Sequence, residues 1–311
     1  MNTARQASLL LVSGLFAFSL GALADSASAA PQADSFQRTA TVRLAGDGER
    51  LDAGIRERSG RQELVLWRVT DGTRRRVAAP PGQKAKLRSE PLPIVEDGSL
   101  TALAWLEGDR PSAMAVRFAA RLGDGWAPVQ VVAPPGPGTQ IGLAGAALDE
   151  GSLLLLWAAF DGQDDEILWS RWSGGTWSDA RPLAGDNAVP DITPAVLAVD
   201  GGALAAWSRF DGRQYQLVTA RFDGRRWSEP MAAAPPGSLY PSFAEGPAGR
   251  HLIYRSAAPR GWGSLALDGS GRIVARTVLP SAELARPSIE APDRWRFPSG
   301  TAATIRWEVT P

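Results

Sequence analysis

Tryptophan recurs at a spacing near fifty residues, and this repeat limits the possible folds more than any other feature of the sequence. Three similar stretches begin with an acidic-glycine turn, continue as an apolar run and end on Trp105, Trp157 and Trp207, which are 52 and 50 residues apart. A second tryptophan follows in each unit, at spacings of 51 and 50 residues: Trp126, Trp177 and Trp227. Two independent markers that share one period indicate tandem structural units.

Each unit has room for four short strands. In the clearest unit, the sequence predicts strands over residues 195–199, 203–210, 214–222 and 227–233. Asp-Gly pairs separate the later strands, and glycine there accepts the positive φ that a tight hairpin needs. Glycine or proline interrupts the stretches that are long enough for a helix. The pattern therefore predicts an all-β chain of four-stranded antiparallel blades, which is typical of a β-propeller.

The length of the chain divided by the period favours about six blades, with five as the alternative. We expect a secretory signal peptide over residues 1–29, a short linker over 30–37 and a single propeller domain over 38–311. The expected repeats are 51–90, 91–138, 139–190, 191–240, 241–285 and 286–311, the last closed with 38–50. In that closure, residues 39–44 would pair with the C-terminal strands and remove two exposed sheet edges.

The N-terminal segment has the three parts of a Sec-type signal peptide. Arg5 gives a positive start, residues 9–23 form an apolar run too short for a comfortable membrane span, and small residues prepare a cleavage site near Ala29. An uncleaved anchor helix is the alternative, and Asp25 directly after the apolar run argues against it. We therefore expect an exported bacterial protein that is periplasmic or secreted and does not insert into the membrane after cleavage.

Composition excludes several kinds of chemistry. The chain has no cysteine and one histidine, His251, so thiol catalysis, thiolate metal sites and most histidine-base chemistry are absent. The 33 basic and 33 acidic residues cancel, so nothing in the charge favours a nucleic-acid partner. We expect a monomer with no cofactor, whose partner is a protein or a glycan.

The turn before the second tryptophan of each unit resembles the Asp-box of sialidases, whose pattern is Ser/Thr-x-Asp-x-Gly-x-x-Trp/Phe. The second half of the box is kept as Gly123-x-x-Trp126, Gly174-x-x-Trp177 and Gly224-x-x-Trp227, with Ser170 at the first position of its unit. The aspartate position holds Arg121, Trp172 and Phe222. The chain is thus similar to the sialidase-like propeller superfamily with degenerate Asp-box (BNR-type) repeats. The resemblance implies the fold and no activity, because the box is structural in that family.

Candidate ligand-binding residues lie in the loops that a propeller gathers on one face. The connections from second to third strands, and from fourth strands to the next first strand, open around the central channel, where propellers usually bind ligands. The residues expected there are Lys84, Lys86, Arg88, Asp109, Arg110, Asp161, Asp164, Asp165, Glu166, Asp186, Asp191, Arg209, Asp211, Arg213, Tyr215, Tyr240 and Arg260. Mixed charges with a few aromatics suit a polar polymer or a peptide, and they equally suit solvated loops.

Two clusters need a separate interpretation. The acidic run from Asp161 to Glu166 offers carboxylates for a weak calcium site, although its spacing does not match an EF-hand and a hairpin tip needs no metal. The repeated tryptophans would suit sugar stacking if each were considered alone. Their regular placement at strand ends instead predicts packing between blades.

These observations leave three functions open, and no catalytic residue is assigned. The first is a non-catalytic propeller that binds a protein or glycan through its channel-side loops. The alternative is a sialidase-like glycoside hydrolase or lyase, which would bring one tyrosine, one carboxylate and at least two arginines together at the channel mouth. The second alternative is a structural module of an envelope assembly, which predicts no polar convergence there.

Overall fold

The computed structural model describes residues 36–45, 48–81, 85–185, 187–246, 249–291, 294–299, 302–304 and 308–309. The expected signal peptide lies outside the described residues, as do Lys84 and Asp186. Within the described part, the regular structure is strands and two three-residue 3-10 helices, Pro111–Ala113 and Asp149–Gly151. None of the residues described forms a helix with the length and apolar character needed to cross a membrane.

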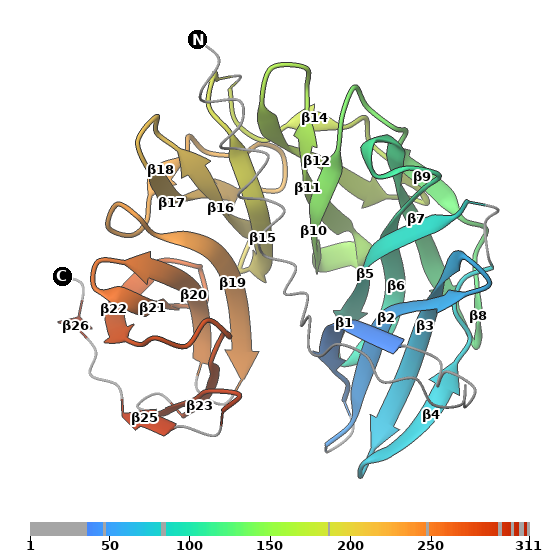
Figure 1. Ribbon diagram of the computed structural model, residues 1–311, viewed down its shortest axis with the longest axis horizontal. Coiled ribbons are helices and arrows are strands. Elements are labelled where there is room, and N and C mark those ends of the chain that lie inside the picture. Colours follow the sequence, from blue (N-terminus) through green and yellow to red (C-terminus); the bar gives the residue numbers. More distant parts are fainter. Residues whose placement is uncertain are drawn as a thin grey trace, which may run out of the picture. The chain divides into compact units, whose positions relative to one another are not determined.

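The strands form six sheets, numbered here in chain order (Figure 1). Sheet 1 contains β1 (Phe36–Arg43), β2 (Arg50–Arg58), β3 (Arg61–Thr70) and β4 (Thr73–Val77). Sheet 2 contains β5 (Leu87–Glu96), β6 (Ser99–Gly108), β7 (Met114–Leu122), β8 (Gly125–Trp126) and β9 (Gln130–Ala133). Sheet 3 contains β10 (Gln140–Ala147), β11 (Leu153–Phe160), β12 (Asp165–Ser173), β13 (Thr176–Trp177) and β14 (Arg181–Pro182).

The remaining sheets continue the same order. Sheet 4 contains β15 (Asp191–Val199), β16 (Gly202–Phe210), β17 (Tyr215–Phe222) and β18 (Met231–Ala232). Sheet 5 contains β19 (Leu239–Gly246), β20 (Gly249–Ala257), β21 (Arg260–Leu267), β22 (Ile273–Pro280) and β26 (Glu308–Val309). Sheet 6 contains β23 (Ser288–Ala291), β24 (Arg294–Arg296) and β25 (Ala302–Thr304). All neighbouring strands are antiparallel, as the Asp-Gly hairpins of the sequence predict.

The expected closure between the two ends of the domain is wrong. Strand β1 pairs with β2, from Phe36 opposite Arg56 to Arg43 opposite Arg50, so residues 39–44 complete sheet 1 and not the C-terminal sheet. Strand β26 pairs with β22 at the outer side of sheet 5. A short turn joins β1 to β2, so their pairing closes a small loop at low entropic cost.

The repeated tryptophans pack between successive sheets, as predicted. Trp105, Trp157 and Trp207 are at most 1% exposed, and each lies in an apolar cluster shared by two neighbouring sheets. Tyr254 has the same role between sheets 4 and 5, and Trp295 between sheets 5 and 6. The first strands also contact one another in order, from β1 and β5 through β10 and β15 to β19. Packing of successive four-stranded sheets through their faces is the propeller-type arrangement.

Aromatic side chains at two of the positions compared with the Asp-box aspartate pack between sheets. Trp172 lies 5.0 Å from the ring of Phe118 on sheet 2, and Phe222 lies 5.3 Å from Trp169 on sheet 3 (ring centroids). Trp177 joins the first aromatic group, at 4.8 Å from Phe118. An aromatic side chain at the aspartate position therefore extends the apolar contact between sheets, where a carboxylate would be desolvated.

The first strands of sheets 2 to 5 share one irregularity. Each has a register shift, and the residue at the shift has a positive φ: 50° at Glu90, 70° at Gly142, 55° at Thr193 and 57° at Tyr240. Such bulges redirect side chains next to functional sites and cost energy when the residue is not glycine. The repeat therefore places a residue of a different type at the equivalent backbone position of each of the four sheets.

Candidate functional site

The candidate site lies at one edge of sheets 3, 4 and 5. We call the edge where first and third strands begin, and second strands end, the top edge of each sheet. All the described candidate residues from the sequence lie at the top edges, because antiparallel pairing brings hairpin ends and strand starts to the same side. The structure then separates those that meet from those that do not.

Side chains from three different sheets interact electrostatically. Asp165 at the start of β12 and Tyr240 on β19 both raise the pKa of the Tyr215 phenol at the start of β17. Asp165 and Tyr215 occupy equivalent repeat positions, since they pair with Phe160 and Phe210 at the ends of β11 and β16. The repeat thus presents a carboxyl group on one sheet and a phenol on the next at the same point of the backbone.

Asp165 lies in surroundings that disfavour its ionised form. The side chain is partly buried, and no described residue donates a hydrogen bond to its carboxyl group. Burial, and next the nearby charge of Asp161, raise the pKa of the Asp165 carboxyl above its ordinary value. A partly accessible carboxyl group with a raised pKa and without a stabilising donor fits a proton donor better than a structural ion pair.

Both tyrosines lie where the ionised phenolate is disfavoured. Burial raises the pKa of both phenols, and for Tyr215 the neighbouring Tyr240 and the charge of Asp165 add to the effect. A phenolate at either position would be unfavourable near neutral pH. The resemblance to sialidases therefore does not extend to their tyrosine nucleophile.

A buried ion pair lies at the top edge of sheet 4, between the first two strands of that sheet. Asp191, 1% exposed, accepts two hydrogen bonds from Arg209: 2.8 Å from Nε to Oδ1 and 2.6 Å from Nη2 to Oδ2. The same arginine lies over the ring of Trp207, 5.6 Å from its centre. Glu166, the neighbour of Asp165, is buried and accepts a 3.1 Å hydrogen bond from the side chain of Asn187. Asp191 and Glu166 thus both accept side-chain hydrogen bonds, whereas Asp165 receives none from a described residue.

The backbone around Tyr240 is fixed by the bulge. Ser208 Oγ accepts the backbone N–H of Tyr240 at 3.0 Å and lies 2.8 Å from Thr193 Oγ1, so the bulges of β15 and β19 are joined through one buried hydroxyl. The carbonyl of Tyr215 accepts the backbone N–H of Gly237 at 2.9 Å, in the loop that leads to β19. These bonds hold the two tyrosines in one arrangement, as a binding site requires.

Replacing Arg209 with methionine should lower the free energy of unfolding by about 3 kcal/mol, because the Asp191 carboxylate would stay buried without its donor. Urea denaturation measures the change. Arg213→Met is the matched control, since Arg213 is exposed and makes no ion pair with a described residue. A loss below about 1 kcal/mol, as for a surface pair, would contradict a supporting role.

Several other candidate residues do not join this group. Asp161 and Asp211 accept backbone N–H groups of their own hairpin turns. Asp109 accepts the backbone N–H of Lys86. The rest are exposed arginines and one buried aspartate: Arg110, Arg213, Arg260 and Asp164. Among the described residues, no three acidic or histidine side chains are arranged to hold a metal ion, and the weak calcium site at Asp161–Glu166 stays a prediction.

Sequence reasoning missed the bulge residues and their partners. Glu90 is partly buried and its Oε2 accepts the backbone N–H of Leu143 at 2.7 Å, so it joins sheets 2 and 3. Burial raises the pKa of the Glu90 carboxyl. A proline follows the bulge residue at 91, 194 and 241, and this pattern near the start of a first strand is the signal that could have found them.

No model of a known protein family matches this sequence, and no curated protein matches it. Solved structures resemble the fold. A protein of unknown function from Dyadobacter fermentans is 16% identical over 77% of this chain and 81% of its own, with a TM-score of 0.56. A puromycin-hydrolyzing peptidase of Mycobacterium tuberculosis is 18% identical with a TM-score of 0.50, over 86% of this chain and 41% of its own. The alpha-L-arabinofuranosidase PaAbf62A from Podospora anserina is 11% identical over 81% and 86% of the two chains, with a TM-score of 0.44.

These comparisons correct the first functional expectation. Several similar structures carry the names of enzymes that act on glycosides, among them a glycosyl hydrolase from Bacteroides ovatus and a xylan beta-1,4-xylosidase from Bacillus halodurans, with TM-scores of 0.41 and 0.44. The interpretation as a non-catalytic binding protein is therefore given up. At such low identity a likeness concerns the fold alone, so the reaction has to be argued from the side chains.

Proposed function

We propose that this chain is an exported glycoside hydrolase in which Asp165 is the general acid and Tyr215 and Tyr240 bind the sugar. One observation carries the proposal: a partly buried carboxyl group, with no hydrogen-bond donor among the described residues, acts electrostatically on Tyr215 of the neighbouring sheet, and Tyr240 of the next sheet acts on the same phenol. Such a group would be a liability in a structural role, because its ionised form is neither solvated fully nor paired.

The chemistry of glycoside cleavage fits this arrangement. The leaving oxygen of a glycosidic bond must be protonated as the bond breaks and water adds to the anomeric carbon. A carboxyl group with a raised pKa keeps its proton to higher pH than an ordinary aspartate and can supply it to that oxygen. The tyrosine rings offer faces for the apolar side of a sugar, and their hydroxyls can donate to ring substituents. The buried Asp191–Arg209 pair links the first two strands of sheet 4 at the same edge.

Turnover of defined substrates tests the proposal. The purified protein without residues 1–29 would be incubated with 4-methylumbelliferyl arabinofuranosides, xylosides, mannosides and sialosides, and with the corresponding polysaccharides. We expect release of the fluorescent alcohol or of reducing ends with at least one sugar, and a large loss of reducing-end release from polysaccharides in Asp165→Asn. No turnover with any substrate at high protein concentration would contradict the proposal.

The pH dependence gives a second prediction. Asp165 acts only when protonated, so kcat/KM should fall as pH rises through its raised pKa, above the range of an ordinary aspartate. Removal of the nearby charge in Asp161→Asn lowers the pKa of Asp165, and the falling limb should move to lower pH. Asparagine preserves the side-chain oxygen that accepts the turn N–H groups. An unmoved limb in this variant would show that another group sets the pH dependence.

A further inference from the structure

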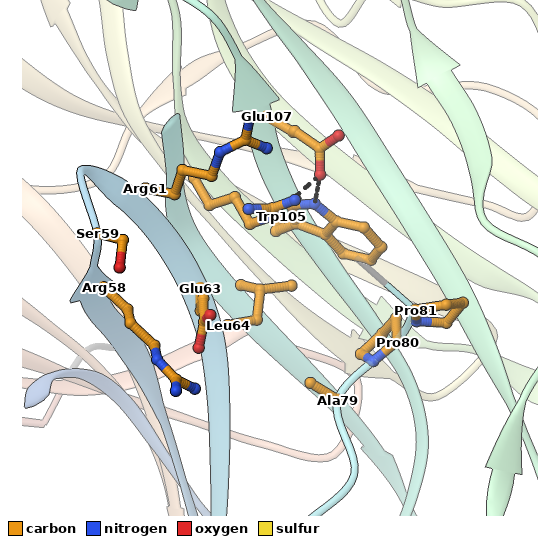
Figure 2. A pocket seen from close by; sticks show the side chains of 11 residues that line it. Arg58, Ser59, Arg61, Glu63, Leu64, Ala79, Pro80, Pro81, Trp105 and Glu107 are labelled. Carbon is orange, nitrogen blue, oxygen red and sulfur yellow. Dashed lines mark hydrogen bonds and ion pairs between the residues drawn. The ribbon is translucent and has the colours of Figure 1, made fainter. Parts of the chain in front are cut away.

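A cavity lies at the top edges of sheets 1 and 2, on different sheets from Asp165, Tyr215 and Tyr240. It has a volume of about 510 Å³ and is lined by the β2–β3 hairpin, the segment before β5 and the end of β6 (Figure 2). That volume is within the range of small-molecule sites. Residues from both sheets contribute charged and apolar side chains to its wall, so the question is which ligand satisfies them.

Glu107 gives the first requirement. It is 2% exposed, and its Oε2 accepts hydrogen bonds from Arg88 Nε at 3.1 Å and from Trp105 Nε1 at 3.0 Å. Its Oε1 is buried and has no hydrogen-bond partner among the residues that the structure describes. A buried acceptor left unmatched costs free energy, so a donor from a ligand would be stabilising. The charge of Glu107 is already neutralised by Arg88, and a hydroxyl group therefore suits this position better than a cation.

The rim gives the second requirement. Arg58 and Arg61 line the cavity from the two sides of the β2–β3 hairpin, and both are labelled in Figure 2. The lining carboxylates each have an arginine already: Glu107 has Arg88, and Glu63 has Arg56 at 2.7 Å. Arg58 is exposed and makes no hydrogen bond or ion pair with a described residue, although its charge also acts on Glu63. The lining contains three arginines and two carboxylates, and this excess of positive charge favours an anion, with a carboxylate as the natural match for guanidinium.

The wall between them gives the third requirement. Leu64, Ala79, Pro80 and Pro81 form an apolar surface on one side of the cavity (Figure 2). A ligand that satisfies all three features has an apolar face, at least one hydroxyl and a carboxylate. A hexuronic acid unit has these three features on one ring.

We infer that this cavity is a separate binding site for an acidic sugar unit of a glycan. The choice of a sugar over other hydroxy acids rests on the proposed glycosidase function, and the unmatched groups of the cavity stand without it. A uronic acid hydroxyl would donate to Glu107 Oε1 while its carboxylate meets Arg58 at the rim. The site would then hold an acidic glycan at sheets 1 and 2 while cleavage takes place at sheets 3 to 5.

Calorimetric titration of the Asp165→Asn protein tests this assignment without turnover. The probes are trigalacturonic acid, neutral galactotriose and malate. We expect the uronate to bind at least about tenfold more tightly than either other probe, a difference of about 1.4 kcal/mol. Arg58→Ala should weaken uronate binding at least about tenfold, since it removes the unpaired guanidinium. Arg213→Ala, also at an exposed hairpin tip, is the control and should leave binding unchanged.

Other outcomes overturn the assignment. Absence of uronate binding, equal binding of galactotriose or malate, or an Arg58→Ala protein with unchanged affinity would each contradict it. Glu107→Gln adds a test of the buried acceptor, and Arg58→Ala remains decisive if that variant fails to fold. Turnover that depends on Asp165 without uronate binding would overturn only the second site. Uronate binding without any turnover would support the second site and contradict only the proposed hydrolysis.

Discussion

Asp165→Asn should lower kcat/KM by ~10²–10⁴-fold for glycosides with poor leaving groups, which is the usual contribution of a general acid. The loss should be smaller for 4-nitrophenyl glycosides, because nitrophenolate leaves without protonation. This dependence on the leaving group separates loss of the acid from loss of binding, which would affect all substrates equally. Initial rates across leaving groups of increasing basicity measure it. A uniform loss would contradict the assignment of Asp165 as the acid.

The same substitution should stabilise the protein at neutral pH. Because the pKa of Asp165 is raised in the folded chain, its ionised form opposes folding once the pH exceeds the pKa of the unfolded chain. Asparagine removes that cost, so the free energy of unfolding should exceed that of the unmodified protein near pH 7. The difference should shrink as the pH falls and the carboxyl group becomes protonated in both states. Asp124→Asn, on an exposed turn at the other edge of sheet 2, should change neither activity nor stability.

Trp207→Ala should lower the free energy of unfolding by about 3–5 kcal/mol, as expected for removal of a large aromatic side chain from a packed core. Trp207 is fully buried and packs in a cluster with Leu154, Ala158 and Phe222, which belong to sheets 3 and 4. Its loss would therefore leave a cavity between two sheets. Urea denaturation followed by circular dichroism measures the change.

Trp227→Ala is the matched comparison for Trp207. Trp227 is partly exposed and contacts Phe222 from the outside, with ring centres 5.1 Å apart. We expect a loss of less than half that of Trp207, because solvent already reaches part of the ring and less area leaves the core. Equal losses for the two variants would contradict the different roles assigned to the two repeated tryptophans.

The repeat could be predicted from the sequence because its markers are local. An Asp-Gly turn and a buried strand that ends on tryptophan impose the same structure wherever they occur, so the second and third strands of sheet 4 match the expected ranges to within a residue. The first strand begins four residues earlier than expected, at Asp191, and the fourth is limited to Met231–Ala232. The two ends of the domain could not be predicted in this way. The sixth sheet packs through Trp295, which lies outside the period, and the pairing of β1 depends on a competition between distant strands.

The candidate site was predictable in location but not in composition. The repeat places Asp165 and Tyr215 at one position of successive units, and both were expected on the channel side. The sequence does not reveal that Asp165 has no donor while Glu166 beside it has Asn187, because that depends on loop geometry. The approach of Tyr240 depends on a bulge, and a bulge changes the direction of a side chain without changing the hydrophobic pattern.

The bulge shared by β5, β10, β15 and β19 separates architecture from chemistry. Its backbone is the same with a carboxylate, a glycine, a hydroxyl or a phenol, so the repeat accepts different residue types at this position while the strands keep their register. Each residue there that is not glycine has a conformational cost of about 1 kcal/mol or more. The tryptophans between the sheets have no such freedom. The bulge residues can therefore change with the ligand while the packing between the sheets stays the same.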